Sequence, residues 1–311
     1  NVMPPVAQAM KNAFPEVEEA TRLPVAGTPK ITYENKTFKD DQMAFVDPDF
    51  FNIFTLPLIE GDARTALQQP NTIIISKAIA KKYFGEEDPL GKTLIFPDNK
   101  NASFKVTGVI NKVPANSHFH FDLFASMLSL DDARSDSWMG SNYFTYLLLK
   151  KGADYKKIEA RLPGMVEKYM GPQIQQSMGL SLKQFITKGN HLGFALQPLT
   201  SIHLYSHANY ELSPPGNAMY VYIFGAIGIF MLLVACINFI NLSTASASQR
   251  AKEVGVRKVI GSGKIQLIKQ FLIESALLVF FSLVISSVLV KFALPFFNNI
   301  SGQDLHFDFN L

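Results

Sequence analysis

Two segments that combine glycine with lysine are the first candidates for chemistry, because such segments can bind nucleotide phosphates. The segment 85–93, GEEDPLGKT, ends like a phosphate-binding loop, but its first glycine stands one position too early. In the segment 261–264, GSGK, Lys258 and Ile265 stand where that loop needs a glycine and a metal-binding hydroxyl. Such a loop also needs a strand before it and a helix after it, which neither segment offers. The sequence therefore predicts no ATP binding and no cofactor.

Four histidines are the next candidates, as possible metal ligands. His118 and His120 alternate in SHFHF, which predicts a strand with both imidazoles on one exposed face. Two imidazoles need further ligands to hold a metal, and the neighbouring sequence supplies no recognisable set. His203 and His207 precede an apolar span and are expected to be polar residues near a membrane surface. We therefore expect no metal site, and no catalytic set marks the chain as an enzyme.

Residues 243–270 are different, because their charges follow a pattern. They hold six Lys and Arg and one Glu, whereas the rest of the chain holds 23 Lys and Arg and 25 Asp and Glu. Apolar residues recur between the charges, and glycines are expected to break the stretch into short helical pieces. One interpretation is a solvated loop that attracts lipid headgroups. The other is an amphipathic surface helix that docks on a cytoplasmic partner, which the regular apolar spacing favours. The candidate docking residues are Arg250, Lys252, Glu253, Gly255, Arg257, Lys258 and Gly261.

Two apolar spans flank this basic stretch. Residues 219–242 contain no charged residue, and residues 271–297 contain only Glu274 and Lys291, near the ends. A bilayer core about 30 Å thick needs about 20 apolar residues in a helix, so each span is long enough to cross. The single cysteine, Cys236, lies in the first span and is expected to be a small packing residue. Because short basic loops are retained in the cytoplasm, residues 1–215 are predicted to lie on the far side.

Residues 1–215 mix helix and strand signals, which predicts an α+β domain. The clearest helix is 76–85, with Ser76 as its N-cap and Gly85 at the left-handed position after its end. A helix from 154 to about 169 should be interrupted at Pro163. Other expected elements are a helix within 2–14, a hairpin at 31–38, a core block at 50–58, and strands at 42–46, 93–96, 103–110, 142–150 and 193–199.

Several separated motifs occur in a fixed order along nearly the whole chain. The pattern R-x-x-E-[IV]-G-[IV]-R lies at 250–257, between ACINFINLSTA at 235–245 and QFLIE at 270–274. With these motifs the chain resembles the FtsX/MacB-type permease subunits of ABC transporters. Upstream motifs are similar to the MacB-type periplasmic core domain of that family: VDPDFF at 46–51, EG at 60–61, ISKAIAKKYFG at 75–85, DPLGK at 88–92 and VTGV at 106–109.

The resemblance implies a MacB-like periplasmic core domain at 1–215, with a sabre-like insertion at about 36–141 and a porter-like remainder. It implies an FtsX-like transmembrane region at 216–311, with helices at about 219–242 and 271–297 in a bacterial inner membrane. The stretch 243–270 would be a coupling helix that rests on a separate cytoplasmic ABC ATPase and transmits ATP-driven motion to the periplasm. Efflux, lipoprotein handling and peptide handling are the activities implied. Further implied partners are a second permease copy or paralogue, membrane lipid and a periplasmic adaptor, and no nucleic acid.

Two other classes of protein are alternatives to this one. A membrane-anchored extracytoplasmic sensor or ligand-binding protein needs a cytoplasmic signalling domain after one crossing, whereas this chain returns after 28 residues. An exterior enzyme on a membrane tether needs a convergent catalytic set. Because the sequence begins at Asn1 with a large exterior domain before its first span, we expect a piece of a longer polytopic protein with four or eight membrane helices.

Overall fold

The computed structural model describes residues 1–39, 41–99, 102–114, 116–206, 208, 210–261, 263–301 and 305. The chain forms two compact units, Asn1–Ala218 and Met219–Leu311. The α-helices of the described residues are α1 (Val6–Ala13), α2 (Phe50–Phe54), α3 (Lys77–Phe84), α4 (Tyr155–Glu159), α5 (Leu162–Met178), α6 (Leu182–Thr187), α7 (Leu199–Tyr205), α8 (Ala218–Val259) and α9 (Lys264–Ser301). Two short 3-10 helices are η1 (Met127–Ser129) and η2 (Asp131–Arg134).

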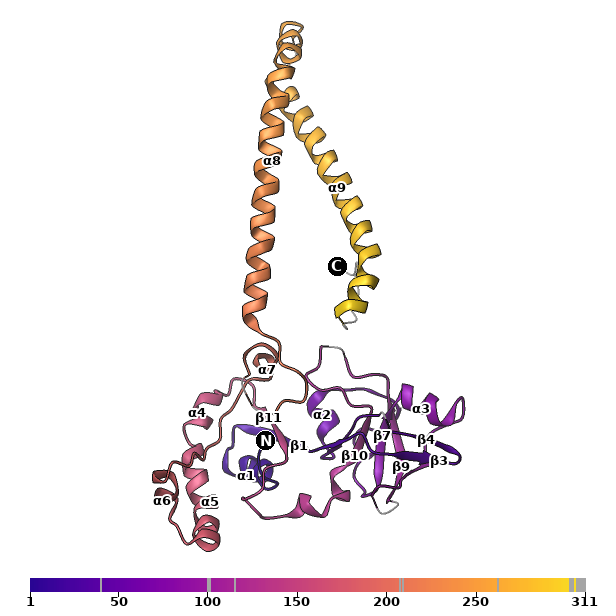
Figure 1. Ribbon diagram of the computed structural model, residues 1–311, viewed down its shortest axis with the longest axis vertical. Coiled ribbons are helices and arrows are strands. Elements are labelled where there is room, and N and C mark those ends of the chain that lie inside the picture. The colour runs from indigo at the N-terminus through magenta and orange to yellow at the C-terminus, as the bar shows by residue number, and fades with distance from the viewer. Residues whose placement is uncertain are drawn as a thin grey trace. The chain divides into compact units, whose positions relative to one another are not determined.

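A mixed sheet of nine strands forms the larger part of the first unit (Figure 1). Its strands are β2 (Val25–Gly27), β3 (Ile31–Tyr33), β4 (Lys36–Phe38), β5 (Met43–Val46), β6 (Leu58–Gly61), β7 (Thr72–Ser76), β8 (Thr93–Phe96), β9 (Ala102–Ile110) and β10 (Leu123–Ser126). They lie in the order β2-β5-β10-β7-β9-β8-β3-β4, and β6 pairs with β9. β10 runs parallel to β5, and β7 runs parallel to β9.

The central strand β7 explains how this sheet is stabilised. All of its residues are buried, and side chains on a strand alternate between the two faces. Ile73 and Ile75 therefore join one apolar cluster, which also contains Tyr83 of α3. Ile74 joins a second cluster, which also contains Phe50 of α2. One helix thus packs on each face of the sheet, and both faces contribute to the core.

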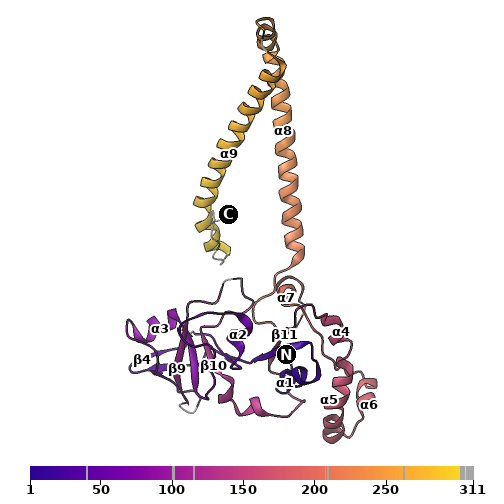
Figure 2. The same ribbon diagram turned by 180° about the vertical axis from the view of Figure 1, so that it is seen from behind.

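A smaller, two-stranded antiparallel sheet lies in the same unit. Its strands are β1 (Val17–Leu23) and β11 (Phe144–Leu149). Residues of α1, α4 and α5 form a third apolar cluster that also contains Val17 and Trp138. Seen from both sides, α4, α5 and α6 lie at the end of the first unit opposite β3 and β4 (Figures 1 and 2). The chain between β1 and β11 builds the large sheet.

Arg22 joins the two sheets of the first unit. Its guanidinium donates to both carboxylate oxygens of Asp47, from Nη2 at 2.8 Å and from Nε at 3.0 Å. Its Nη1 donates to the backbone carbonyls of Pro4, at 3.0 Å, and Ala133, at 2.7 Å. Both charged side chains are only 17% exposed. One arginine on β1 therefore holds together the entry to α1, the segment after β5, and η2.

Most elements expected in residues 1–190 are confirmed. The helix at 76–85 is α3, where the Ser76 hydroxyl accepts from the Ile79 N–H at 3.3 Å and Gly85 has φ 68°. The hairpin at 31–38 is formed by β3 and β4. The helix expected from 154 is interrupted before Pro163, where α4 ends and α5 begins. Capping and turn chemistry act locally, which is why these elements can be predicted from short segments.

The expectation of a strand at 193–199 is wrong. The described residues there form no ladder, and α7 begins at Leu199. Leu192, Phe194 and Leu196 still point inward in alternation, as in a strand. The Leu196 N–H, however, donates to the Glu159 carboxylate at 2.9 Å instead of to a neighbouring strand. The period-two pattern therefore reflects an extended chain packed on apolar side chains.

The second unit consists of the long helices α8 and α9. By length and composition both could cross a membrane, over Ala218–Ser246 and Lys264–Ile300, with mean hydropathy 2.6 and 2.5. The helices run antiparallel, meet at the turn between them and diverge away from it (Figures 1 and 2). Their large apolar side chains are exposed in the isolated chain, as expected for surfaces that face lipid or other membrane helices.

Candidate functional site

The basic stretch forms the closed end of the α8–α9 hairpin. It was expected to break into short helical pieces at Gly255, Gly261 and Gly263, and this is wrong for Gly255, which lies inside α8. Among the described residues of this stretch, helix is interrupted only between Val259 and Lys264, where Gly261 has φ 98°. A single glycine costs a helix about 1 kcal/mol, which the long flanking helix tolerates. Gly261 supplies the left-handed backbone that the turn requires.

An ion pair closes the hairpin near its end. Arg250 of α8 donates from Nη1 and Nη2 to the two carboxylate oxygens of Glu274 on α9, at 2.7 and 2.8 Å. This two-bond geometry is specific to the arginine fork and a carboxylate. The guanidinium also lies over the Phe271 ring, 5.9 Å from its centroid. Arg250, predicted to dock on a partner, thus acts first within its own chain.

Arg257 makes a second connection, about two helical turns nearer the tip. It pairs with Glu253 on α8 at 2.6 Å, in the favourable order with the acid four residues earlier. It also donates from Nη1 to the Gln270 side-chain oxygen on α9, at 2.7 Å. Two of the predicted site residues, Glu253 and Arg257, are therefore brought together, and Arg257 also connects α8 to α9.

The remaining predicted residues lie on the outside of the hairpin end. Lys252 and Lys258 are exposed and form no ion pair with any described residue. Val259 is 90% exposed and Ile260 is 79% exposed, and both lie beyond the apolar span Ala218–Ser246. Adjacent exposed apolar side chains outside a membrane-spanning segment can mark an interaction site. We name this group the turn surface; it consists of Lys252, Lys258, Val259, Ile260, Lys264 and Ile265.

Glu274 and Gln270, the partners of the two arginines on α9, are not among the residues predicted from the sequence. Glu274 was interpreted as a charge near a span end that reaches the membrane surface. A signal for the pairing was available, because residues about equally far from a hairpin turn lie opposite each other. Arg250 and Glu274 stand 11 and 13 residues from Gly261. Glu274, the charge within the second apolar span, therefore has a partner in Arg250, which lies at a similar distance from the turn.

The histidines do not form the exposed strand face that was predicted, and this expectation is wrong. Residues 117–121 form no strand, and His118 lies among Phe54, Phe119 and Tyr146. The His118 Nε2 is 2.7 Å from the Tyr146 hydroxyl. Burial lowers the pKa of His118 and raises the pKa of Tyr146, because an apolar setting disfavours both charged forms. A neutral His118 is thus part of an aromatic cluster.

No group of three potential metal ligands occurs among the described residues. His203 lies in α7, where its carbonyl accepts from the Gly216 N–H at 2.7 Å. His207 lies outside the described residues. In the segment that resembles a phosphate loop, the Lys92 amine pairs with the Glu87 carboxylate and lies 5.6 Å from the centroid of the Tyr33 ring. Its charge is therefore neutralised by a neighbouring acid.

Two protein-family models match this chain, one in each of its two units. Residues 1–164 match the MacB-like periplasmic core domain, and residues 225–311 match the FtsX-like permease C-terminal region. MacB of Aggregatibacter actinomycetemcomitans, a macrolide export ATP-binding/permease protein, is 25% identical over 252 residues, covering 78% of this chain and 34% of MacB. PvdT of Pseudomonas syringae, a pyoverdine export ATP-binding/permease protein, is 25% identical over 239 residues, covering 75% and 32%.

A crystallised domain assigned to a permease protein of Porphyromonas gingivalis is similar over 54% of this chain and 71% of that domain. Its sequence identity is 29% and its TM-score is 0.49. The chain spans about a third of the length of its MacB and PvdT relatives. Because the core-domain model alone covers more than half of the residues, the chain belongs to the FtsX/MacB-type permeases of ABC transporters.

Proposed function

We propose that this chain is a permease subunit of a bacterial ABC transporter and that its turn surface docks on a separate cytoplasmic ABC ATPase. The observation that carries the proposal is that the side chains at the hairpin end form two groups with different contacts. Arg250 and Arg257 hold the two helices together, while Lys252, Lys258 and Ile260 remain exposed. Exposed apolar side chains flanked by lysines suit a protein groove, since headgroup attraction alone needs only the positive charge.

The proposed orientation follows from the same charges. The basic hairpin end is placed in the cytoplasm, and α8 and α9 cross the inner membrane as parts of a multi-pass protein. Residues 1–215 are then periplasmic. The names of MacB and PvdT describe ATP-binding and permease functions together, whereas we assign ATP hydrolysis to a partner of this chain.

In this proposal, the ATP-driven motion of the partner ATPase is transmitted to the first unit. We assign a sabre-like role to residues 36–141, which contain most strands of the large sheet, and a porter-like role to the remainder with β1 and β11. The large exposed apolar surfaces of α8 and α9 support contact with lipid and with a second permease copy or paralogue. A periplasmic adaptor is a further proposed partner. The cargo classes remain efflux substrates, lipoproteins and peptides.

Site-directed crosslinking in native membranes tests the docking. Cys236→Ser removes the single cysteine, and Lys258→Cys then places a thiol on the turn surface. A short bifunctional crosslinker should join this position to a protein that mass spectrometry identifies as an ABC ATPase. Phe280→Cys, which replaces an exposed apolar residue in the middle of α9, is the matched control and should give no such product.

Docking would be wrong if Lys258→Cys crosslinked no ATPase while the protein was present at its normal level in the membrane. Thiol labelling tests the orientation separately. A membrane-impermeant maleimide should label Ser141→Cys in intact spheroplasts and label Lys258→Cys only after the membrane is opened. The reversed labelling order would overturn the orientation.

A further inference from the structure

A cavity in the first unit has no role in the docking described above. It measures about 520 Å³ and lies between α1, β11, α5 and the extended segment before α7. Small-molecule sites in proteins usually measure about 300–1,000 Å³. The cavity is therefore large enough for a small ligand, and it lies beside the third apolar cluster.

The chemistry of the cavity wall is unusual in two respects. None of the residues that line it is Asp, Glu, Lys or Arg. Four of the ten methionines of the chain, Met3, Met10, Met139 and Met170, line it. Methionine side chains are flexible and polarisable, so they adapt to ligands of irregular shape. Such a wall accepts an apolar body and penalises a charge that enters without a partner.

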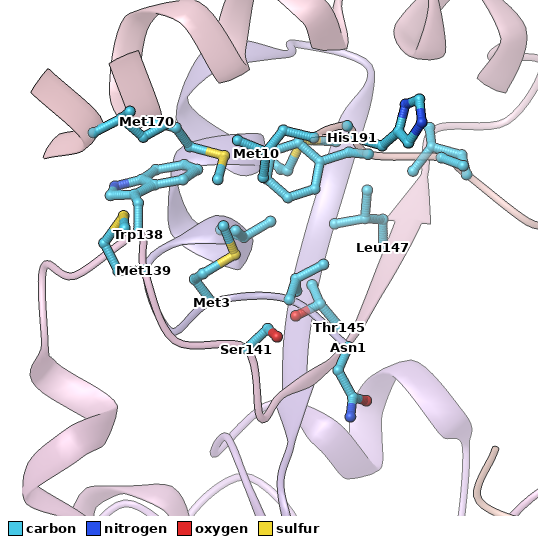
Figure 3. Close-up of a pocket in the computed structure, with 18 of the residues that line it drawn as sticks. Asn1, Met3, Met10, Trp138, Met139, Ser141, Thr145, Leu147, Met170 and His191 are labelled. Carbon is cyan, nitrogen blue, oxygen red and sulfur yellow. The ribbon is translucent and has the colours of Figure 1, made fainter. Parts of the chain in front are cut away.

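Apart from His191, the labelled polar residues of the cavity are separated from its most apolar end. Figure 3 shows Ser141, Thr145 and Asn1 together toward one end, and Trp138 and Met170 toward the other, while His191 lies apart from both groups. The Trp138 indole is stacked on Tyr169, with ring centroids 4.6 Å apart and an interplanar angle of 6°. The stack fixes one wall of the apolar end. Hydroxyl and amide groups are then available at the opposite end to bind a neutral polar group.

We propose that this cavity binds an uncharged, single-chain amphiphile, with its alkyl chain among the methionines and Trp138 and its hydroxyl-bearing head beside Ser141. The size and the absence of charged lining residues select a small neutral ligand. The separation of polar from apolar groups selects an amphiphile and sets its direction. The site lies wholly in the first unit, so it stands independently of the proposed ATPase docking.

Trp138 makes the proposal testable, because it is the only tryptophan of the chain. Bromine quenches indole fluorescence on contact, so ligand dissolved in the bilayer does not quench Trp138 at a distance. The full chain in lipid nanodiscs is titrated with 1-(10-bromodecanoyl)glycerol and with the 2-bromo isomer. We expect saturable quenching that is stronger for the 10-bromo isomer, since its bromine lies at the chain end near Trp138.

Charge and occupancy are tested with matched compounds and variants. 10-Bromodecanoate and (10-bromodecyl)trimethylammonium have similar chains but charged heads, and they should bind about tenfold more weakly, or about 1.4 kcal/mol. Ser141→Phe and Ala195→Phe each place a ring in the cavity wall and should abolish saturable quenching. Met178→Leu, at a half-exposed position outside the cavity, should leave quenching unchanged.

Ser141→Phe and Ala195→Phe are the filling variants. Each is used only if its Trp138 emission and unfolding midpoint match those of the unchanged protein. If one of them fails to fold, the other provides the test. Linear quenching without saturation would overturn the site. So would equal quenching in a folded filling variant. Equal affinity for the charged compounds would overturn the ligand class, and stronger quenching by the 2-bromo isomer would overturn the proposed direction.

Discussion

Arg250 of α8 and Glu274 of α9 form a two-bond ion pair that connects the helices across the closed end of their hairpin. The predicted docking residues are thus of two kinds. Some set the geometry of the hairpin end, and others are free to meet a partner. Variants at the two kinds should fail in different ways.

Reversing one charge of this pair should separate the helices near the turn. Arg250→Glu places two carboxylates opposite each other, and Glu274→Arg places two guanidiniums there, so each single variant should lose ATPase-coupled transport. The exchanged pair Arg250→Glu with Glu274→Arg should recover part of the transport, because the attraction returns. Disulfide formation between cysteines placed on α8 and α9 would report the helix separation. No recovery in the double variant would contradict this geometry.

Arg257→Glu and Glu253→Lys should each uncouple ATP hydrolysis from transport. Each change breaks the pair between these residues and alters the charge pattern of the hairpin end. Arg257→Lys is the conservative control; it keeps the charge but removes the fork that also reaches Gln270. ATP hydrolysis and transport are measured together in reconstituted vesicles. Normal transport with normal ATPase binding in both charge-reversal variants would show that this face does not couple.

Asp47→Asn should destabilise the first unit by about 3 kcal/mol, because it leaves the Arg22 guanidinium without its charged partner in a largely buried site. Glu19→Gln is the matched control, since the Lys11–Glu19 pair is more than a third exposed on both sides. That change should cost less than about 1 kcal/mol. Denaturant unfolding of the full chain, followed by Trp138 fluorescence, measures both. Equal effects would mean that Arg22 does not join the two sheets energetically.

Gly61→Ala should also destabilise the large sheet. Gly61 has φ 88°, and an added Cβ would lie 2.5 Å from the backbone oxygen of Thr107 on the neighbouring strand. Left-handed backbone with a side chain costs about 1–2 kcal/mol, and the close contact adds to it. Gly164→Ala in α5, where a Cβ meets nothing within 4 Å, should be neutral or slightly stabilising. An equal loss for both would contradict the close approach of β6 and β9.

His118 should make the first unit less stable as the pH falls. Its pKa is lowered by burial from an ordinary value of 6.5, so below that pH the unfolded chain binds a proton that the folded chain does not. Stability from this residue is complete above pH 6.5 and decreases as the pH falls toward the lowered pKa. His118→Gln should flatten the pH profile of unfolding in this window. An unchanged profile would show that His118 titrates normally in the folded protein.

Local signals in the sequence predicted much of this fold. Ser76 and Gly85 mark the ends of α3, and Pro163 marks the break before α5, because caps and prolines act through the nearest backbone groups. The apolar spans and the charge bias near Arg250 likewise need no tertiary information. The α+β mixture also followed from element types alone.

The remaining features depend on contacts between distant residues. The alternation at 192–196 resembles a strand, but its inward side chains pack in the third cluster and its backbone finds no partner strand. His118 alternates with His120 as a strand would, yet Tyr146 and Phe54 from other segments enclose it. The similar distances of Arg250 and Glu274 from Gly261 indicate their pairing only if α8 is known to continue through Gly255. Periodicity shows which side chains are inward, and it does not show what they meet.

The continuity of α8 has a mechanical consequence. The helix runs without interruption for 42 residues, a rod of about 60 Å, and contains no proline, whereas α9 contains Pro295. Ala218, where the rod begins, is also the last residue of the first unit. If a continuous helix tilts as a rigid body, a small rotation near one end displaces the other end by a larger distance. In the proposed coupling, a displacement of Lys258 would be transmitted along α8 to Ala218.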